Sequence, residues 1–174
     1  MSATPNSAAP RPEQPAIKIR TALLDDDSNL MHLINTAFVV ERVALEGDRV
    51  DLEGVRLLLG KGTFLIAESA AAPTELLGCV YVDPRGERCY LGLLAVAPNH
   101  QGRGIGRRLT AAAEEFARSA ACIAMDLRII SPRAADLVPL YARLGYTEFG
   151  TAPFPPDVIT KIPCHYIAMA KSLI

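Results

Sequence analysis

The chain has 174 residues, of which 50% are hydrophobic and 21% are charged, and its formal net charge is −1. This length and apolar content suit one domain with a sizeable core, and the near-zero charge gives no electrostatic basis for binding nucleic acid or an anionic membrane. No apolar run of the sequence approaches the ~20 residues that a membrane span requires.

The four cysteines are scattered and form neither a Cys-x-x-Cys motif nor a cluster with histidine: Cys79, Cys89, Cys122 and Cys164. A zinc site and a disulfide framework are therefore not expected, and we predict that the protein holds no metal. Such cysteine usage is typical of a reducing compartment, so we expect a cytoplasmic protein.

The first segment of the chain, residues 1–16, is rich in alanine, proline, serine and threonine. It lacks the apolar core of a secretory signal. We expect residues 1–16 to form a flexible tail and residues 17–174 to form a single domain.

Two helices are predicted after a first strand. Ile17 to Arg20 alternates in the manner of a strand. Asp25 to Ser28 offers an N-cap and first-turn carboxylates, and an apolar stripe at helical spacing then runs to Phe38. A second helix is expected from Arg49 to Leu59, ended by the glycines that follow.

Three more strands are expected next, at Thr63 to Glu68, Leu76 to Asp83 and Cys89 to Val96. A Pro84-Arg85-Gly86 turn is predicted to join the second of these to the third. The third is apolar throughout, which is typical of a strand buried on both faces.

The second half of the chain alternates helices and strands. A helix at 104–121 and a strand at 125–130 follow the strand that ends at Val96, which favours a parallel pair joined by a crossover. The remaining elements are expected to be a short helix at 134–144, a strand from Tyr146 to Phe149, a long connection with four prolines at 150–163, and a final strand at 162–169.

The turn between the strand ending at Val96 and the next helix reads Gln101-Gly102-Arg103-Gly104-Ile105-Gly106. The first N–H groups of a helix are unpaired and carry partial positive charge, and glycines let an anion approach without a β-carbon in the way. Arg107 and Arg108 oppose the helix dipole unless an anion binds there. We predict that this turn holds phosphate, although its spacing fits neither the dinucleotide fingerprint nor the P-loop.

These residues resemble motif A of the GNAT superfamily, the acyl-CoA-dependent N-acetyltransferases. The family pattern Val-x-Pro-x-x-Gln/Arg-Gly-x-Gly-x-Gly/Ala is matched at each fixed position from Val96 to Gly106, and Leu140 to Tyr146 looks like the family's Leu-Tyr-x-x-x-Gly-Phe/Tyr segment. The resemblance covers the chain from about Ile17 to its end. It implies a single α/β domain with a mixed central sheet of about six or seven strands, splayed at the acetyl-CoA site, and about four helices.

The resemblance further implies that acetyl-CoA is the co-substrate. Its pantetheine arm would pair with the backbone of Leu94, Ala95 and Val96, and the N–H of Leu94 would polarise the thioester carbonyl. The residues expected around its diphosphate are Gln101, Gly102, Arg103, Gly104, Ile105, Gly106 and Arg107.

Tyr141 occupies the family position that faces the sulfur of CoA, so the resemblance gives it the role of protonating the leaving thiolate. Periodicity alone offers another interpretation, because Tyr141 falls on an apolar helical face and could be an ordinary core tyrosine. The general base stays open, since residues 89–93 carry no carboxylate. The candidates are Glu87 acting through water, His165 (which could equally be a core residue) and bulk water.

We therefore expect an N-acetyltransferase that moves an acetyl group from acetyl-CoA to a primary amine by direct attack in a ternary complex. The acceptor, a small molecule or a peptide, would be framed by residues 38–49 and 150–163, whose mixed charges show no clear preference. A catalytically weak acyl-CoA-binding sensor or regulatory module is the alternative, favoured by the missing strand glutamate, and a transferase of longer acyl chains is a third. Whether the protein forms a homodimer and whether residues 150–163 act as a lid stay open.

Overall fold

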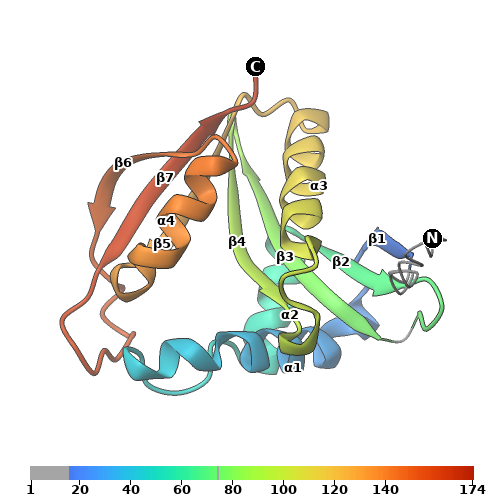
Figure 1. The fold of residues 1–174 in the computed structure, drawn as a ribbon, viewed down its shortest axis with the longest axis horizontal. Helices are drawn as coiled ribbons and strands as arrows, with labels where there is room; N and C mark the ends of the chain where they lie inside the picture. Colours follow the sequence, from blue (N-terminus) through green and yellow to red (C-terminus); the bar gives the residue numbers. More distant parts are fainter. Residues whose placement is uncertain (1–15, 74) are drawn as a thin grey trace, which may run out of the picture.

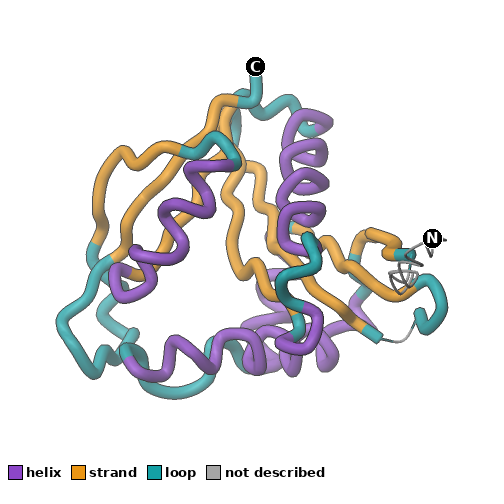
Figure 2. The backbone as a smooth tube through the Cα atoms, viewed as in Figure 1, coloured by secondary structure: helices purple, strands orange, loops and turns teal. Residues whose placement is uncertain are grey.

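The structure, a computed structural model, describes residues 16–73 and 75–174. The predicted tail lies outside the described residues except for Ala16. The remainder forms one α/β domain in which helices cover both faces of a central sheet (Figures 1 and 2). No helix in the described part is long and apolar enough to cross a membrane.

The central sheet is mixed and has seven strands, as the sequence predicts. Its strands are β1 (Ile17–Thr21), β2 (Thr63–Ser69), β3 (Leu76–Arg85), β4 (Arg88–Val96), β5 (Ala124–Ile130), β6 (Thr147–Ala152) and β7 (Tyr166–Ser172). They lie in the order β1-β2-β3-β4-β5-β7-β6, and all neighbours are antiparallel except the parallel pair β4 and β5. The predicted crossover therefore joins the two strands at the middle of the sheet.

Four α-helices pack on this sheet in the described part of the chain: α1 (Asp27–Ala37), α2 (Leu52–Lys61), α3 (Ile105–Ser119) and α4 (Ala134–Arg143). Alternate residues of β2 show how the two faces differ, because neighbouring side chains of a strand point in opposite directions. Phe64 and Ile66 belong to the core under α1 and α2, whereas Leu65 and Ala67 belong to the core under α3 and α4. The described part of the chain thus builds one main core on each face of the sheet.

β4 and β5 separate partway along their length. Their pairing runs from Arg88 opposite Ala124 to Leu91 opposite Leu127 and then stops, while both strands continue to Val96 and Ile130. Figure 1 shows the two strands diverging between α3 and α4. The backbone of β4 beyond Leu91 is therefore left without a strand partner on its β5 side.

A 3-10 helix, η2 (Phe38–Val43), lies below this opening (Figure 1). It is fastened to the segment between β6 and β7 by a bridge between Leu45 and Thr160. The N–H of Glu46 donates to the carbonyl of Ile159 at 3.0 Å, and the N–H of Lys161 donates to the carbonyl of Ala44 at 2.8 Å. The two segments that were expected to frame the acceptor are thus joined to each other by backbone hydrogen bonds.

The predicted Pro84-Arg85-Gly86 turn is wrong in its position. Pro84 and Arg85 belong to β3 and pair with β4, so the turn consists only of Gly86 and Glu87. Gly86 has a φ of +71°, a conformation that two-residue hairpin turns require and that glycine adopts without strain.

Two other boundaries also differ from prediction. The second helix begins at Leu52 because the side chain of Asp51 accepts a hydrogen bond from the N–H of Gly54 at 2.7 Å and caps it. The last strand begins only at Tyr166. The backbone before it, at Lys161, bonds to the end of η2 and not to the sheet.

Candidate active site

β4 carries a β-bulge beside the point where it leaves β5. Cys79 and Tyr81 of β3 pair with Ala95 and Gly92, so one residue of β3 faces two residues of β4. Within the bulge Leu93 has a φ of +47°, which is uncommon for a residue with a side chain. A bulge removes backbone groups from the ladder and redirects the strand. The predicted pantetheine edge from Leu94 to Val96 therefore begins at an irregularity, on the side that β5 leaves free.

The glycine-rich turn after β4 presents unpaired backbone N–H groups. Gly102 and Gly104 have φ values of +74° and +78°, and Gly104 is the N-cap of α3. Within this fully described stretch, the N–H groups of residues 102–107 donate to no backbone carbonyl, and the first to do so is that of Arg108. Successive free amides at the positive end of a helix form a cradle for an anion.

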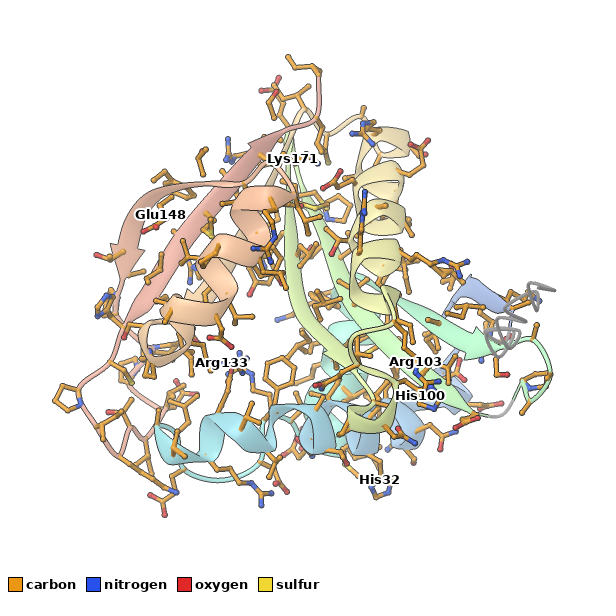
Figure 3. The ribbon with its side chains drawn as sticks, viewed as in Figure 1. His32, His100, Arg103, Arg133, Glu148 and Lys171 are labelled. Carbon is orange, nitrogen blue, oxygen red and sulfur yellow. The ribbon has the colours of Figure 1, made fainter. Side chains whose placement is uncertain are left out.

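The cradle is open to solvent. A β-carbon added at Gly102 or at Gly104 would meet no atom within 4 Å. Arg103 and Arg107 are exposed beside it, and Figure 3 shows Arg103 on the turn that precedes α3. These residues fit a diphosphate, because free amides, positive side chains and open approach occur together.

Three other side chains of this region have structural partners. Gln101 donates from Nε2 to the carbonyl of Val96 at 3.2 Å and so ties the turn to the end of β4. Ile105 is buried, which leaves only its backbone for a ligand. Arg108 donates to the carbonyl of Ile17 at 2.9 Å and holds β1, so it supports the fold at that point.

Tyr141 lies on α4 and is 7% exposed. Its ring meets that of Tyr146 edge-on, with centroids 5.7 Å apart. Burial, followed by the neighbouring Tyr90, raises the pKa of the Tyr141 hydroxyl to about 12. The hydroxyl is therefore protonated near neutral pH. Both the structural and the catalytic interpretation of Tyr141 are compatible with its burial, and a protonated hydroxyl suits a proton donor.

Tyr90 is a site residue that the sequence interpretation missed. Burial raises the pKa of its hydroxyl, and the charges of Arg49 and Arg128 lower it. The ring of Tyr90 also lies 4.6 Å from the guanidinium carbon of Arg85. The one sequence signal for Tyr90 is Gly92, two residues later on the same face of the strand, where a missing side chain leaves space for a ring.

Glu41 is a second residue that was not singled out, although it lies within the segment 38–49 that was expected to frame the acceptor. It is 7% exposed, and its Oε2 has no hydrogen-bond partner among the described residues. Burial raises the pKa of this carboxyl group, while the charges of Arg49 and Arg133 lower it. A lone acidic residue in the apolar run from Phe38 to Val43 was the available signal.

The candidate general bases fall in different places. Glu87 lies in the hairpin turn at the start of β4, and seven residues of extended strand put it roughly 23 Å from Leu94. It is too distant to serve the site through one water molecule. His165 is exposed, so it is not a core residue. Its backbone N–H donates to the side-chain hydroxyl of Ser131, the residue that follows β5, at 3.1 Å.

Among the described residues, no group of histidine, cysteine and acidic side chains is arranged to hold a metal ion. Cys79, Cys89 and Cys122 are buried as free thiols. Burial raises the pKa of Cys79 and of Cys89 to about 12. The thiols of Cys79 and Cys89 are therefore protonated core side chains near neutral pH.

Residues 29–146 match the model of the acetyltransferase (GNAT) family. This match covers more than half of the chain, and it includes both the glycine-rich turn and Tyr141.

Solved structures of acetyltransferases share the fold. The ribosomal-protein-S18-alanine N-acetyltransferase from Escherichia coli is 17% identical with a TM-score of 0.72, and the match covers 91% of this chain and 94% of that one. The putative acetyltransferase yncA from Salmonella typhimurium, solved with acetyl-CoA, is 24% identical with a TM-score of 0.69, covering 91% and 95%. Nourseothricin acetyltransferase is 20% identical with a TM-score of 0.70, covering 91% and 99%. At these identities the likeness establishes the architecture, including the open sheet.

Proposed function

Because this chain belongs to the GNAT acetyltransferase family, we propose that it transfers the acetyl group of acetyl-CoA to a primary amine by direct attack in a ternary complex. The observation that carries the proposal is the run of free N–H groups at residues 102–107, next to the unpaired edge of β4. The first feature suits an anion and the second suits a ligand with peptide-like amides. Coenzyme A has both a diphosphate and a pantetheine arm.

The binding roles follow from these two features. The amides of residues 102–107, with Arg103 and Arg107 beside them, would hold the diphosphate. Gln101 positions the turn through its bond to Val96. The backbone from Leu94 to Val96 would pair with the amide groups of the arm, as an added strand would.

Acetyl-CoA supplies the acetyl group as a thioester. In the transfer, the ammonium first loses a proton to bulk water. The amine nitrogen then forms a bond to the carbonyl carbon, the carbon–sulfur bond breaks, and the nitrogen loses a second proton to water, from which Tyr141 regains the proton that it gives to the sulfur. The N–H of Leu94 would donate to the oxygen on which negative charge develops. The hydroxyl of Tyr141, which is protonated near neutral pH, would give its proton to the departing sulfur.

A screen of primary amines with acetyl-CoA, detecting the free thiol, tests the proposal. We expect turnover with at least one class of amine, and Tyr141→Phe should lower kcat about 100-fold, a typical contribution of a proton donor, without changing the Kd for acetyl-CoA. Tyr81→Phe is the matched control, since Tyr81 is a buried tyrosine on the opposite face of the sheet. A regulatory acyl-CoA-binding module would instead bind acetyl-CoA and release no thiol with any amine.

A further inference from the structure

The buried face of η2 is directed toward the place where β4 and β5 separate. Residues three apart are aligned in a 3-10 helix, so Glu41 and Ala44 share one face. Ala44 is 0% exposed and packs in a small core with Ile130, the last residue of β5. Glu41 therefore faces the end of β5, below the opening between β4 and β5.

Glu41 is a buried carboxylate without a hydrogen-bonded partner. Its Oε2 is enclosed and unpaired within the described part of the chain. Arg133 lies near enough to lower its pKa, but the guanidinium of Arg133 pairs with Asp136 at 2.6 Å. Figure 3 shows Arg133 between the start of α4 and η2. An unpaired buried carboxylate is costly, and a cationic ligand would remove that cost.

Arg49 is likewise a charged side chain with an enclosed, unpaired polar atom, but its charge is positive. Its Nε is enclosed and has no hydrogen-bond acceptor among the described residues. Its guanidinium stacks 5.4 Å from the centroid of Phe38, at the start of η2. Phe38 and Glu41 are three residues apart in η2 and therefore share one face, so the stacked guanidinium of Arg49 lies on the face that carries Glu41.

Glu41 and Arg49 carry opposite charges on the same face of η2, yet their enclosed Oε2 and Nε atoms have no hydrogen-bond partner among the described residues. Two such groups normally lower their energy by pairing. Because they are not paired with each other, the Glu41 carboxylate can accept hydrogen bonds from a bound ligand and the Arg49 guanidinium can donate them. A molecule that carries an ammonium and an anionic group would satisfy both at once.

We propose, building on the function proposed above, that the acceptor is a small zwitterionic amine of the amino-acid type, with its ammonium on Glu41 and its carboxylate on Arg49. The backbone bonds between residues 44–46, just after η2, and residues 159–161 favour a compact acceptor, because an extended peptide cannot pass between these segments where they are joined. Glu41 and Arg49 are thus specificity-determining residues of the acceptor site.

The test compares each L-amino acid with its carboxamide and with its decarboxylated amine, using acetyl-CoA and thiol detection. The wild-type enzyme should prefer an amino acid over its carboxamide by roughly 10- to 100-fold in kcat/KM, the range for a charged hydrogen bond. Arg49→Gln should lower kcat/KM for the amino acid far more than for its carboxamide and so remove this preference. Glu41→Gln should lower kcat/KM for both substrates by a similar factor, because both carry the ammonium.

Matched controls lie on the same segment. Glu46→Gln and Arg42→Gln change exposed charges, and Arg42 is already paired with Asp48, so both variants should keep the wild-type preference. Binding of acetyl-CoA, measured by calorimetry, should be the same in all five proteins, which shows that each variant is folded.

The possible failures are distinct. Rapid turnover of decarboxylated amines with poor turnover of amino acids overturns the zwitterionic acceptor but leaves the acetyltransferase standing. Equal losses on the amino acid and on the carboxamide in Arg49→Gln overturn the role of Arg49. Absence of turnover with every amine overturns the proposed function and this inference with it.

Discussion

The ring of Tyr90 lies across Gly92, two residues further along β4. A β-carbon built at Gly92 would stand 2.7 Å from Cε1 of that ring, and side chains two apart in a strand share one face. The glycine therefore gives Tyr90 its position in the candidate site.

Gly92→Ala is expected to displace the Tyr90 ring and to cost about 1–3 kcal/mol of unfolding free energy, as overpacking does. Denaturant unfolding measures this cost. Gly60→Ala is the control, since no atom lies within 4 Å of a β-carbon there, and alanine within α2 should stabilise by about 0.5–1 kcal/mol. Equal stability of the two variants would contradict the account.

A buried polar network connects α3 to the last strands. Glu114 accepts a hydrogen bond from the hydroxyl of Tyr146 at 3.1 Å and pairs with Lys171 at 2.7 Å. Glu114→Ala should cost about 3 kcal/mol, the lower end for breaking a buried pair, because Lys171 is partly exposed and can turn to water. Thermal and denaturant unfolding should show that Glu115→Ala, at an exposed neighbouring position, changes stability by less than about 0.5 kcal/mol. A similar effect of both substitutions would disprove the network's contribution.

Asp26 links the first strand to the first helix. It pairs with Arg20 at 2.7 Å, and this hydrogen bond holds the pKa of Asp26 below its ordinary value of 3.8. The stabilisation is therefore present above the ordinary pKa and is lost as the pH falls through the lower folded value. Asp26→Asn should be less stable than wild type at pH 7, and the difference should shrink below about pH 4.

Melting temperatures from pH 7 to pH 3 test this prediction. Asp25→Asn, at an exposed neighbouring position without a hydrogen-bonded partner in the described chain, is the control. A difference between Asp26→Asn and wild type that stays constant over the whole range would argue against the ion pair.

Two glycines of the anion cradle, Gly104 and Gly106, allow one alanine substitution to serve as the control for the other. Gly104→Ala places a β-carbon on a backbone with a φ of +78°, which costs roughly 1–2 kcal/mol. We expect it to weaken binding of CoA by distorting the free amides. Gly106→Ala makes only ordinary contact, 3.7 Å from Val96, so its stability and its affinity for CoA should stay near the wild-type values. Calorimetric titration of both variants with CoA compares their affinities, and a greater loss of affinity in Gly106→Ala than in Gly104→Ala would contradict the prediction.

Local patterns were enough to predict the elements and the cradle. The apolar strand ending at Val96, the glycines at 102, 104 and 106, and the amphipathic α3 all depend on neighbours in the sequence. Conformations with φ above zero are the ones that glycine provides, so the turn could be anticipated. The start of α2 was missed because a single cap at Asp51 decides it.

Long-range contacts could not be predicted from the sequence. The bridge between Leu45 and Thr160 and the bulge at Leu93 both depend on segments that are adjacent only after folding. The acceptor side of the site is made of such contacts, whereas the cradle is made of one continuous segment. For this reason a phosphate-binding turn could be inferred from the residues, whereas the acceptor site could not.

Titration of the wild-type protein with coenzyme A by calorimetry, together with its melting temperature at saturation, tests the central claim most directly. We expect saturable binding that raises the melting temperature, and much weaker binding of pantetheine, which lacks the diphosphate that the amides of residues 102–107 would hold. Saturating coenzyme A that gives neither heat nor thermal protection would contradict the account, as would pantetheine that binds as tightly as coenzyme A.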